Sequence, residues 1–217
     1  RLLLGIAAKI GEDWEFKFEH DFKAKTTTDM FLKYKGWGPT LTVGQFYGAF
    51  GMEEQSSSRW ISYMERSTPT NLFAAPFSRR QGVGLNGTLG DQFMYAGAVQ
   101  FDRVDDADEV DSATSFTTGN PGDDPLVYTA TFGWAPMNKE ADKQLFFGYA
   151  YGLQDLEDSE TPAARFSSRA ALRIDGTPSI IDSGNVNADD FAVHNLQSAF
   201  IYGPFSASAE YFDASVS

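Results

Sequence analysis

The feature that most constrains this chain is a two-residue hydrophobic alternation that recurs along most of its length. From Trp14 to Ala24 the even positions are mostly apolar, whereas the odd positions from Glu15 to Lys25 are all charged. Successive side chains of a β-strand point to opposite faces, so this pattern predicts a strand with one apolar and one polar face. The chain is therefore expected to be all-β.

The pattern predicts ten strands and a weaker eleventh at 165–174. The ten are 2–10, 14–25, 29–35, 40–46, 81–88, 92–101, 126–134, 144–152, 191–203 and 205–216. Many are about ten residues long, which is the length that a tilted membrane strand needs.

The connections between these strands alternate in length. The short ones are 11–13, 36–39, 89–91 and 203–204, and the long ones are 47–80, 102–125 and 153–190. Long loops at one rim and short turns at the other are typical of an outer-membrane β-barrel. Because a long connection must begin and end at the same rim, segment 153–190 can hold two membrane strands or none. The stretch 165–174 therefore either pairs with a second strand near 178–187 or lies within a folded loop.

A soluble antiparallel β-sandwich, or a surface-attached β-domain that binds a ligand, is the alternative. Two predicted strands carry aromatic residues on one face and small residues on the other, among them Gly133, Gly148 and Ala150. Such a small face is unusual toward water, and Trp and Tyr near strand ends suit a membrane interface. The pattern favours a transmembrane antiparallel barrel and leaves the sandwich open.

Composition excludes several classes of protein. With 17 Lys and Arg against 30 Asp and Glu, the net charge of −13 argues against a nucleic acid partner. The longest nearly apolar run, Leu2 to Ala8, is far shorter than a spanning helix. No cysteine is present, so disulfides and thiolate metal sites are excluded. The chain opens at Arg1 within an apolar run, so we expect a single domain, 1–217, that is part of a longer chain.

No motif for catalysis, a cofactor or a metal emerges, and an enzyme is not expected. The histidines are His20 and His194, and His194 would be the candidate for a lipid hydrolase inside a barrel. The acidic connection 102–125 departs from the calcium-loop pattern and is expected to be a solvated outer loop.

The long connection 47–80 is rich in aromatic residues and is expected to fold into the barrel lumen and narrow it. It carries Arg59, Arg66, Arg79 and Arg80 against Glu53, Glu54 and Glu65, a local balance of +1. Arginine binds phosphate or carboxylate groups in a bidentate manner, so the loop predicts a constriction that attracts anions. The alternative is that Glu65 and Arg66 pair with wall charges and hold the loop in place.

Three stretches, 43–46, 53–67 and 195–212, resemble the phosphate-selective porin O and P family. They read VGQF, EEQSSSRWISYMERS and NLQSAFIYGPFSASAEYF. The resemblance implies a barrel of about 16 strands, of which about ten are present here and the C-terminal ones are missing. It also implies a homotrimer in the outer membrane of a Gram-negative bacterium, in contact with outer-membrane lipid and lipopolysaccharide.

The resemblance further implies passive diffusion of small hydrophilic solutes, especially anions such as phosphate. Ser57, Ser58 and Arg66 match positions that help to bind the anion, and Arg165 and Arg169 resemble arginines that guide anions along the pore. Phosphate-selective members carry lysine just before the serine pair, where this chain has Glu54. Weak selectivity is therefore expected, and a general or cation-tolerant porin is the alternative.

Overall fold

We describe the protein from a computed structural model. It describes residues 2–57, 61, 63, 65–101, 103–104, 126–140, 142–156, 165–169, 178–184 and 186–217. The strands are β1 (Leu3–Ile10), β2 (Trp14–Asp21), β3 (Thr26–Tyr34), β4 (Thr40–Tyr47), β5 (Arg79–Leu89), β6 (Phe93–Gln100), β7 (Val127–Glu140), β8 (Lys143–Asp155), β9 (Ser167–Arg169), β10 (Ser179–Asp182), β11 (Asp190–Tyr202) and β12 (Phe205–Val216). Helical turns are α1 (Met52–Gln55), the π-helix η1 (Thr70–Ala74) and the 3-10 helix η2 (Ala75–Phe77).

Ten strands form one sheet in the order β1-β2-β3-β4-β5-β6-β7-β8-β11-β12, and every neighbouring pair is antiparallel. The ten predicted strands and the all-β class are thus confirmed. The eleventh segment forms β9, which pairs with β10 in a separate two-stranded sheet. Of the two predicted arrangements, the pairing with a second strand near 178–187 is confirmed, and the described residues of this connection contribute no strand to the main sheet.

Some predicted boundaries were wrong. The strand expected over 14–25 ends at Asp21, because a carboxylate oxygen of Asp21 accepts the N–H groups of Lys23 and Ala24 at 2.9 and 3.2 Å. This turn, closed by Lys25 with a φ of 57°, lets β3 begin at Thr26, three residues earlier than expected. The alternation itself could not reveal the turn, because residues 22–25 continue the period of two.

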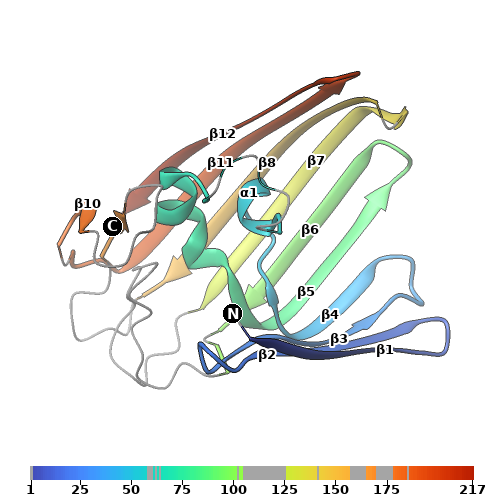
Figure 1. The fold of residues 1–217 in the computed structure, drawn as a ribbon, viewed down its shortest axis with the longest axis horizontal. Helices are drawn as coiled ribbons and strands as arrows, with labels where there is room; N and C mark the ends of the chain where they lie inside the picture. Colours follow the sequence, from blue (N-terminus) through green and yellow to red (C-terminus); the bar gives the residue numbers. More distant parts are fainter. Residues whose placement is uncertain are drawn as a thin grey trace.

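The ends of the strands divide into two rims. The turns 11–13, 35–39, 90–92 and 203–204 lie on the right in Figure 1, and the strand ends that the long connections join lie on the left. The four-residue turn 22–25 shares the rim of the long connections, so the division by length has one exception.

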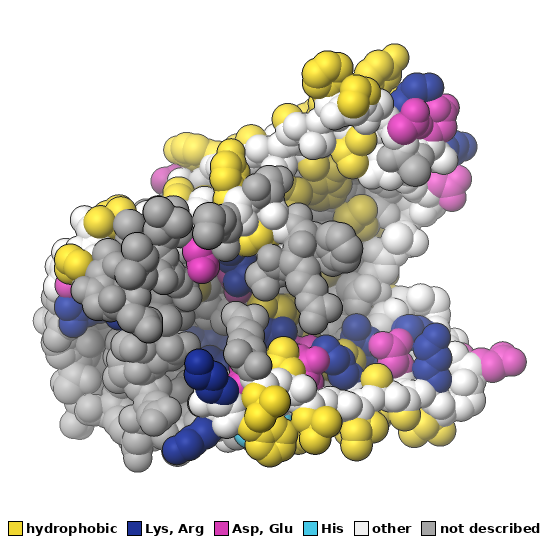
Figure 2. Space-filling model, viewed as in Figure 1, with side chains coloured by type: hydrophobic (Ala, Val, Ile, Leu, Met, Phe, Trp, Pro, Cys, Tyr) yellow, Lys and Arg dark blue, Asp and Glu magenta, His cyan; other side chains and the backbone are white. Residues whose placement is uncertain are grey.

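The two faces of the sheet differ in polarity. On the outer face, large apolar side chains such as Phe132, Trp134 and Phe147 are exposed. The inner face carries polar groups, and Figure 2 shows charged side chains along the hollow and apolar ones on the outside of the lower strands. No helix within the described residues is long and apolar enough to span a membrane.

The connection between β4 and β5 lies across the hollow of the curved sheet, where Figure 1 shows α1 and the following helical turns. Its residues Phe50, Ala74 and Phe77 join a buried cluster with Val127 of β7, Ala150 of β8, and Phe191 and Val193 of β11. The face of small residues predicted for this strand points inward on β8, and it makes room for this loop. At Gly152, a Cβ atom would lie 2.7 Å from the ring of Phe77.

Candidate functional site

The short helix α1 is attached to the far end of the sheet. The carboxylate of Glu210 on β12 accepts the N–H groups of Met52 at 2.7 Å and Glu53 at 3.0 Å. A carboxylate stabilises these first N–H groups because they have no partner within the helix and carry the positive end of its dipole. These hydrogen bonds between Glu210 and α1 join parts of the chain that are 158 residues apart.

Arg66 lies against the other end of α1. Its guanidinium donates to the carbonyl oxygens of Glu53, Glu54 and Ser56 at 3.3, 2.9 and 3.1 Å, and it forms an ion pair of 3.3 Å with the Glu54 carboxylate. The Arg66 side chain is 22% exposed and that of Glu54 is 7% exposed. Arg66 therefore holds the loop together, and Glu54 offsets much of its positive charge.

Glu53 braces the next part of the loop. Its carboxylate accepts the hydroxyl hydrogens of Ser67 at 2.7 Å and Thr70 at 2.6 Å, and it also accepts the N–H of Ser67. These bonds connect α1 to the first residue of η1. Polar contacts therefore hold the loop together on one side, and its apolar side chains join the buried cluster on the other.

A second group of charges lies on the wall of the sheet. Arg79 on β5 forms an ion pair of 2.7 Å with Asp29 on β3, donates to the Tyr47 hydroxyl at 2.8 Å and lies over the Tyr47 ring. Lys17 on β2 also bonds to Asp29. Arg80 is buried and donates to the carbonyl of Pro76 at 3.1 Å, which ties β5 to the loop.

Arg165 and Arg169 lie apart from these groups, at the β9-β10 hairpin. Arg165 forms two hydrogen bonds of 2.9 and 2.6 Å with Asp182, and the guanidinium lowers the pKa of the Asp182 carboxyl to about 2. The hairpin approaches the loop through Phe166, whose ring lies 6.3 Å from that of Phe73.

The predicted site residues therefore fall into three places. Arg66 lies on the loop, Arg79 and Arg80 lie at the start of β5, and Arg165 and Arg169 lie at the hairpin. Ser57 is exposed, two residues after the end of α1. Ser58 and Arg59 lie outside the described residues.

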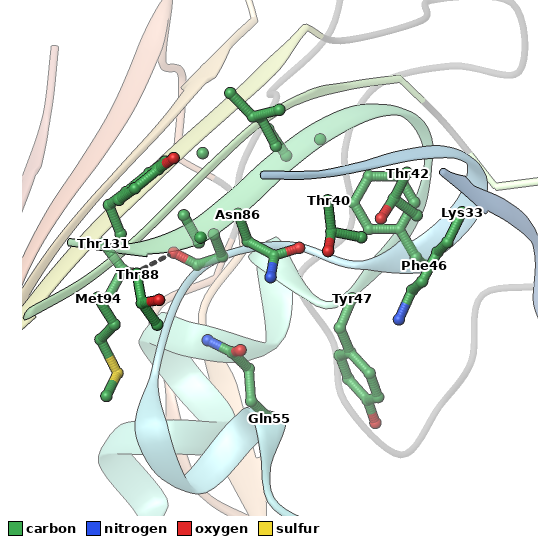
Figure 3. A pocket seen from close by; sticks show the side chains of 18 of the residues that line it. Lys33, Thr40, Thr42, Phe46, Tyr47, Gln55, Asn86, Thr88, Met94 and Thr131 are labelled. Carbon is green, nitrogen blue, oxygen red and sulfur yellow. Dashed lines mark hydrogen bonds between the residues drawn. The ribbon is translucent and has the colours of Figure 1, made fainter. Parts of the chain in front are cut away.

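Between the loop and the inner face of the sheet lies a cavity of about 820 Å³. Figure 3 shows side chains from β3, β4, β5 and β6 on one side of it and Gln55 of α1 on the other. Asp29 and Lys33 line this cavity, whereas the predicted arginines are absent from its described lining. Lys33 makes no ion pair within the described residues, and it lies over the ring of Phe31.

Lys33 and Asp29 were not predicted as site residues. The alternation in the sequence could have indicated them, because Asp29, Phe31 and Lys33 share one face of their strand. That face continues the charged face of β2, since Glu15 lies directly opposite Lys33 in the sheet. Reading the register across both strands would have found them.

Among the described residues, His194 forms no hydrogen bond to a serine, as a hydrolase site of the expected kind would require. Its Nδ1 lies 2.7 Å from the hydroxyl of Tyr149, and its direct neighbours across the sheet are Tyr151 and Asp213. Among the described residues, no group of three or more His, Cys, Asp or Glu side chains is placed to hold a metal ion.

Comparison with known proteins agrees with this geometry. A family model described as phosphate-selective porin O and P matches residues 1–217. Porin O of Pseudomonas aeruginosa is 27% identical to this chain over 97% of the chain and 50% of its own length, so the chain spans about half the length of this curated relative. The chain belongs to the phosphate-selective porin O and P family, a family of channels and not of enzymes, which indicates the Gram-negative outer membrane as its location.

Proposed function

We propose that this chain forms part of a closed barrel of about 16 strands through which small hydrophilic solutes diffuse passively. The observation that carries the proposal is the cavity of about 820 Å³ left between the β4-β5 connection and the polar face of the sheet. Fixed charges and the width of such a passage decide which solutes pass. In this proposal the sheet closes with further strands, and segment 47–80 constricts the lumen.

We propose weak selectivity for anions, phosphate among them. Lys33 lines the cavity without an ion pair to a described residue, and the Arg66 side chain is partly exposed beside the neutralising Glu54. A carboxylate about 4 Å from a bound phosphate would oppose binding by about 4 kcal/mol at an effective dielectric constant of 20. The residues proposed to guide or bind anions are Ser57, Ser58, Arg59, Arg66, Arg79, Arg80, Arg165 and Arg169.

The partners remain part of the proposal. The family supports a homotrimer in contact with outer-membrane lipid and lipopolysaccharide. Three aromatic side chains, Trp14, Tyr34 and Trp37, lie side by side at the short-turn end of β2 and β3. The ring centroids of Trp14 and Tyr34 are 4.7 Å apart with the rings tilted, and those of Tyr34 and Trp37 are 5.1 Å apart in an edge-to-face arrangement. Such rings suit the membrane interface, where one end of a Trp or Tyr side chain is apolar and the other is wet.

The test is the zero-current potential of the full-length protein in a planar bilayer under a salt gradient. The unmodified protein is expected to give a zero-current potential whose sign indicates a modest preference for anions. Arg66→Ala is expected to shift it toward cations, and Glu54→Gln toward anions. Glu140→Gln is the matched control, since Glu140 pairs with Lys143 at the rim, away from the cavity. A cation preference in the unmodified protein would favour the general or cation-tolerant porin instead, and an unaltered potential in Arg66→Ala would place the filter elsewhere.

A further inference from the structure

The cavity beneath the loop is lined mainly by uncharged side chains. Of its described lining residues, Asp29 and Lys33 carry charges, and Asp29 is already paired with Lys17 and Arg79. Arg66, on the loop beside the cavity, already pairs with Glu54 and donates to three carbonyl oxygens. Among the described lining residues, an anion in this cavity would therefore meet Lys33 as the single cation without an ion pair.

The neutral polar groups of the cavity, in contrast, have unused hydrogen-bonding capacity. The side chains of Thr40, Gln55, Asn86 and Thr88 make no side-chain hydrogen bond within the described part of the chain. Figure 3 shows that the amides of Gln55 and Asn86 and the hydroxyls of Thr40 and Thr88 point into one space. Amides and hydroxyls both donate and accept, so together they match a ligand whose groups also do both.

Aromatic rings form the other part of the lining. Glycine residues on the strands leave room for these rings to pack flat against the sheet. A Cβ atom on Gly84 would come 2.8 Å from the ring of Phe46, and one on Gly87 would come 2.6 Å from the hydroxyl of Tyr95. Phe146 lies over Gly148 in the same manner, at 2.8 Å. Each ring thus covers the space where a side chain would stand and offers an apolar surface to the cavity.

We propose that this cavity binds a neutral polyhydroxylated solute, such as a sugar or polyol, as it passes through the channel. A sugar presents hydroxyl groups around its edge and C–H groups on its ring faces. The hydroxyls match the amides and threonines, and the C–H faces match the aromatic rings. The volume falls in the range of about 300–1,000 Å³ typical of small-molecule sites. This inference rests on the proposed channel function, and it names a solute class that the arginines do not suggest.

The experiment measures ion current through the full-length protein in a planar bilayer while maltotriose is added. A polyethylene glycol of similar hydrodynamic size serves as the reference for simple exclusion. Saturable block by maltotriose, at concentrations where the polymer has little effect, is the expected result. Phosphate at equal concentration is expected to block less.

Three variants locate the site. Asn86→Ala and Gln55→Ala are each expected to weaken the block about two- to tenfold, as the loss of one hydrogen bond predicts. Tyr95→Leu removes a ring and is expected to weaken it to a similar degree. Gln144→Ala and Tyr202→Leu are the matched controls, because both side chains lie outside the cavity, and the block is expected to persist in them.

The outcomes separate the two proposals. Channels that conduct ions but respond alike to maltotriose and polymer would overturn the sugar site and leave the porin function standing. Equal weakening in the control variants would overturn the assignment to this cavity. A full-length protein that forms no channel would overturn both.

Discussion

Gly152 on β8 lies directly beneath the ring of Phe77, the residue that ends the helical part of the loop. A methyl group there would meet three ring carbons at 2.7 to 2.9 Å, closer than carbon atoms can pack. Gly152→Ala is therefore expected to cost about 1–3 kcal/mol, because the ring must move out of the buried cluster. The measurement is the temperature at which the folded full-length protein unfolds on detergent gels.

Two further variants give this prediction its control. Gly97→Ala also adds a methyl group to a strand glycine, but there it would meet only the carbonyl oxygen of Thr129 at 3.5 Å. It is expected to leave the transition temperature nearly unaltered. Phe77→Leu in the Gly152→Ala background is expected to recover part of the loss. An equal drop in both glycine variants would show that strand glycines, and not the loop, account for the effect.

The ion pair of Asp182 with Arg165 predicts that the stability of the β9-β10 hairpin depends on pH. Its pKa of about 2 lies below the ordinary 3.8 because Arg165 donates two hydrogen bonds to its carboxylate. A lowered folded pKa stabilises the hairpin fully above about pH 4, and this contribution is lost as the pH falls through about 2. Hydrogen exchange of peptide 178–184, corrected for the intrinsic rate, is expected to lose protection between these values.

Asp182→Asn removes the titrating group from the hairpin. Protection in this variant is expected to be lower at neutral pH and to depend less on acid. Asp142→Asn, in the turn between β7 and β8, is the control and is expected to behave like the unmodified protein. Loss of protection near pH 5 in the unmodified protein would contradict the assigned pair.

At the scale of elements, the loop depends on one carboxylate from the far end of the sheet. Glu210 holds the first N–H groups of α1, and each such charge-assisted bond contributes about 1.5–3 kcal/mol. Glu210→Ala is expected to free α1, to increase open-channel current noise and to speed trypsin cleavage after Arg66 at least tenfold. Glu210→Gln keeps one accepting oxygen and is expected to fall between.

The control for this prediction is Glu140→Ala. Glu140 is also a strand glutamate, but its partner is Lys143, at 2.7 Å, and it makes no hydrogen bond or ion pair with the described residues of the loop. Noise and cleavage are expected to stay at the unmodified level in this variant. Equal cleavage in Glu210→Ala and the unmodified protein would show that the apolar cluster alone positions α1.

At the scale of the whole molecule, the sheet is inverted relative to a soluble domain, with apolar side chains outside and polar ones inside. Backbone groups within a bilayer must be paired with one another, and a sheet with neighbouring antiparallel strands pairs them except at its edges. In the described chain β1 and β12 are these edges. Closure by further strands would pair them, which is why channel experiments require the full-length protein.

The two rims predict an orientation in the membrane. Long connections of such barrels face the exterior and short turns face the periplasm. Single cysteines replacing Asp91, in a short turn, and Ser112, in the acidic connection, test this in intact cells with a labelling reagent too large for the pore. Labelling is expected at position 112 and absent at 91. The reverse pattern would invert the proposed topology.

Local pattern determined the strands of this protein. The alternation over 14–21 or 205–216 is a property of neighbouring residues, and short turns leave adjacent strands little choice but to pair antiparallel. The family resemblance rested on equally local stretches around positions 43–67 and 195–212. For these reasons the number of strands in the main sheet and the class of protein were predictable.

Tertiary structure alone decided what the loop does. The hydrogen bonds from α1 to Glu210 join residues 158 positions apart, and no short-range sequence pattern indicates so distant a partner. Likewise, Arg66 resembled an anion ligand in the sequence, but folding gave it Glu54 and three carbonyl oxygens as partners. The cavity lining depends on which side chains of separate strands meet beneath the loop, and that follows from register and packing across the whole sheet, which the sequence of one segment does not contain.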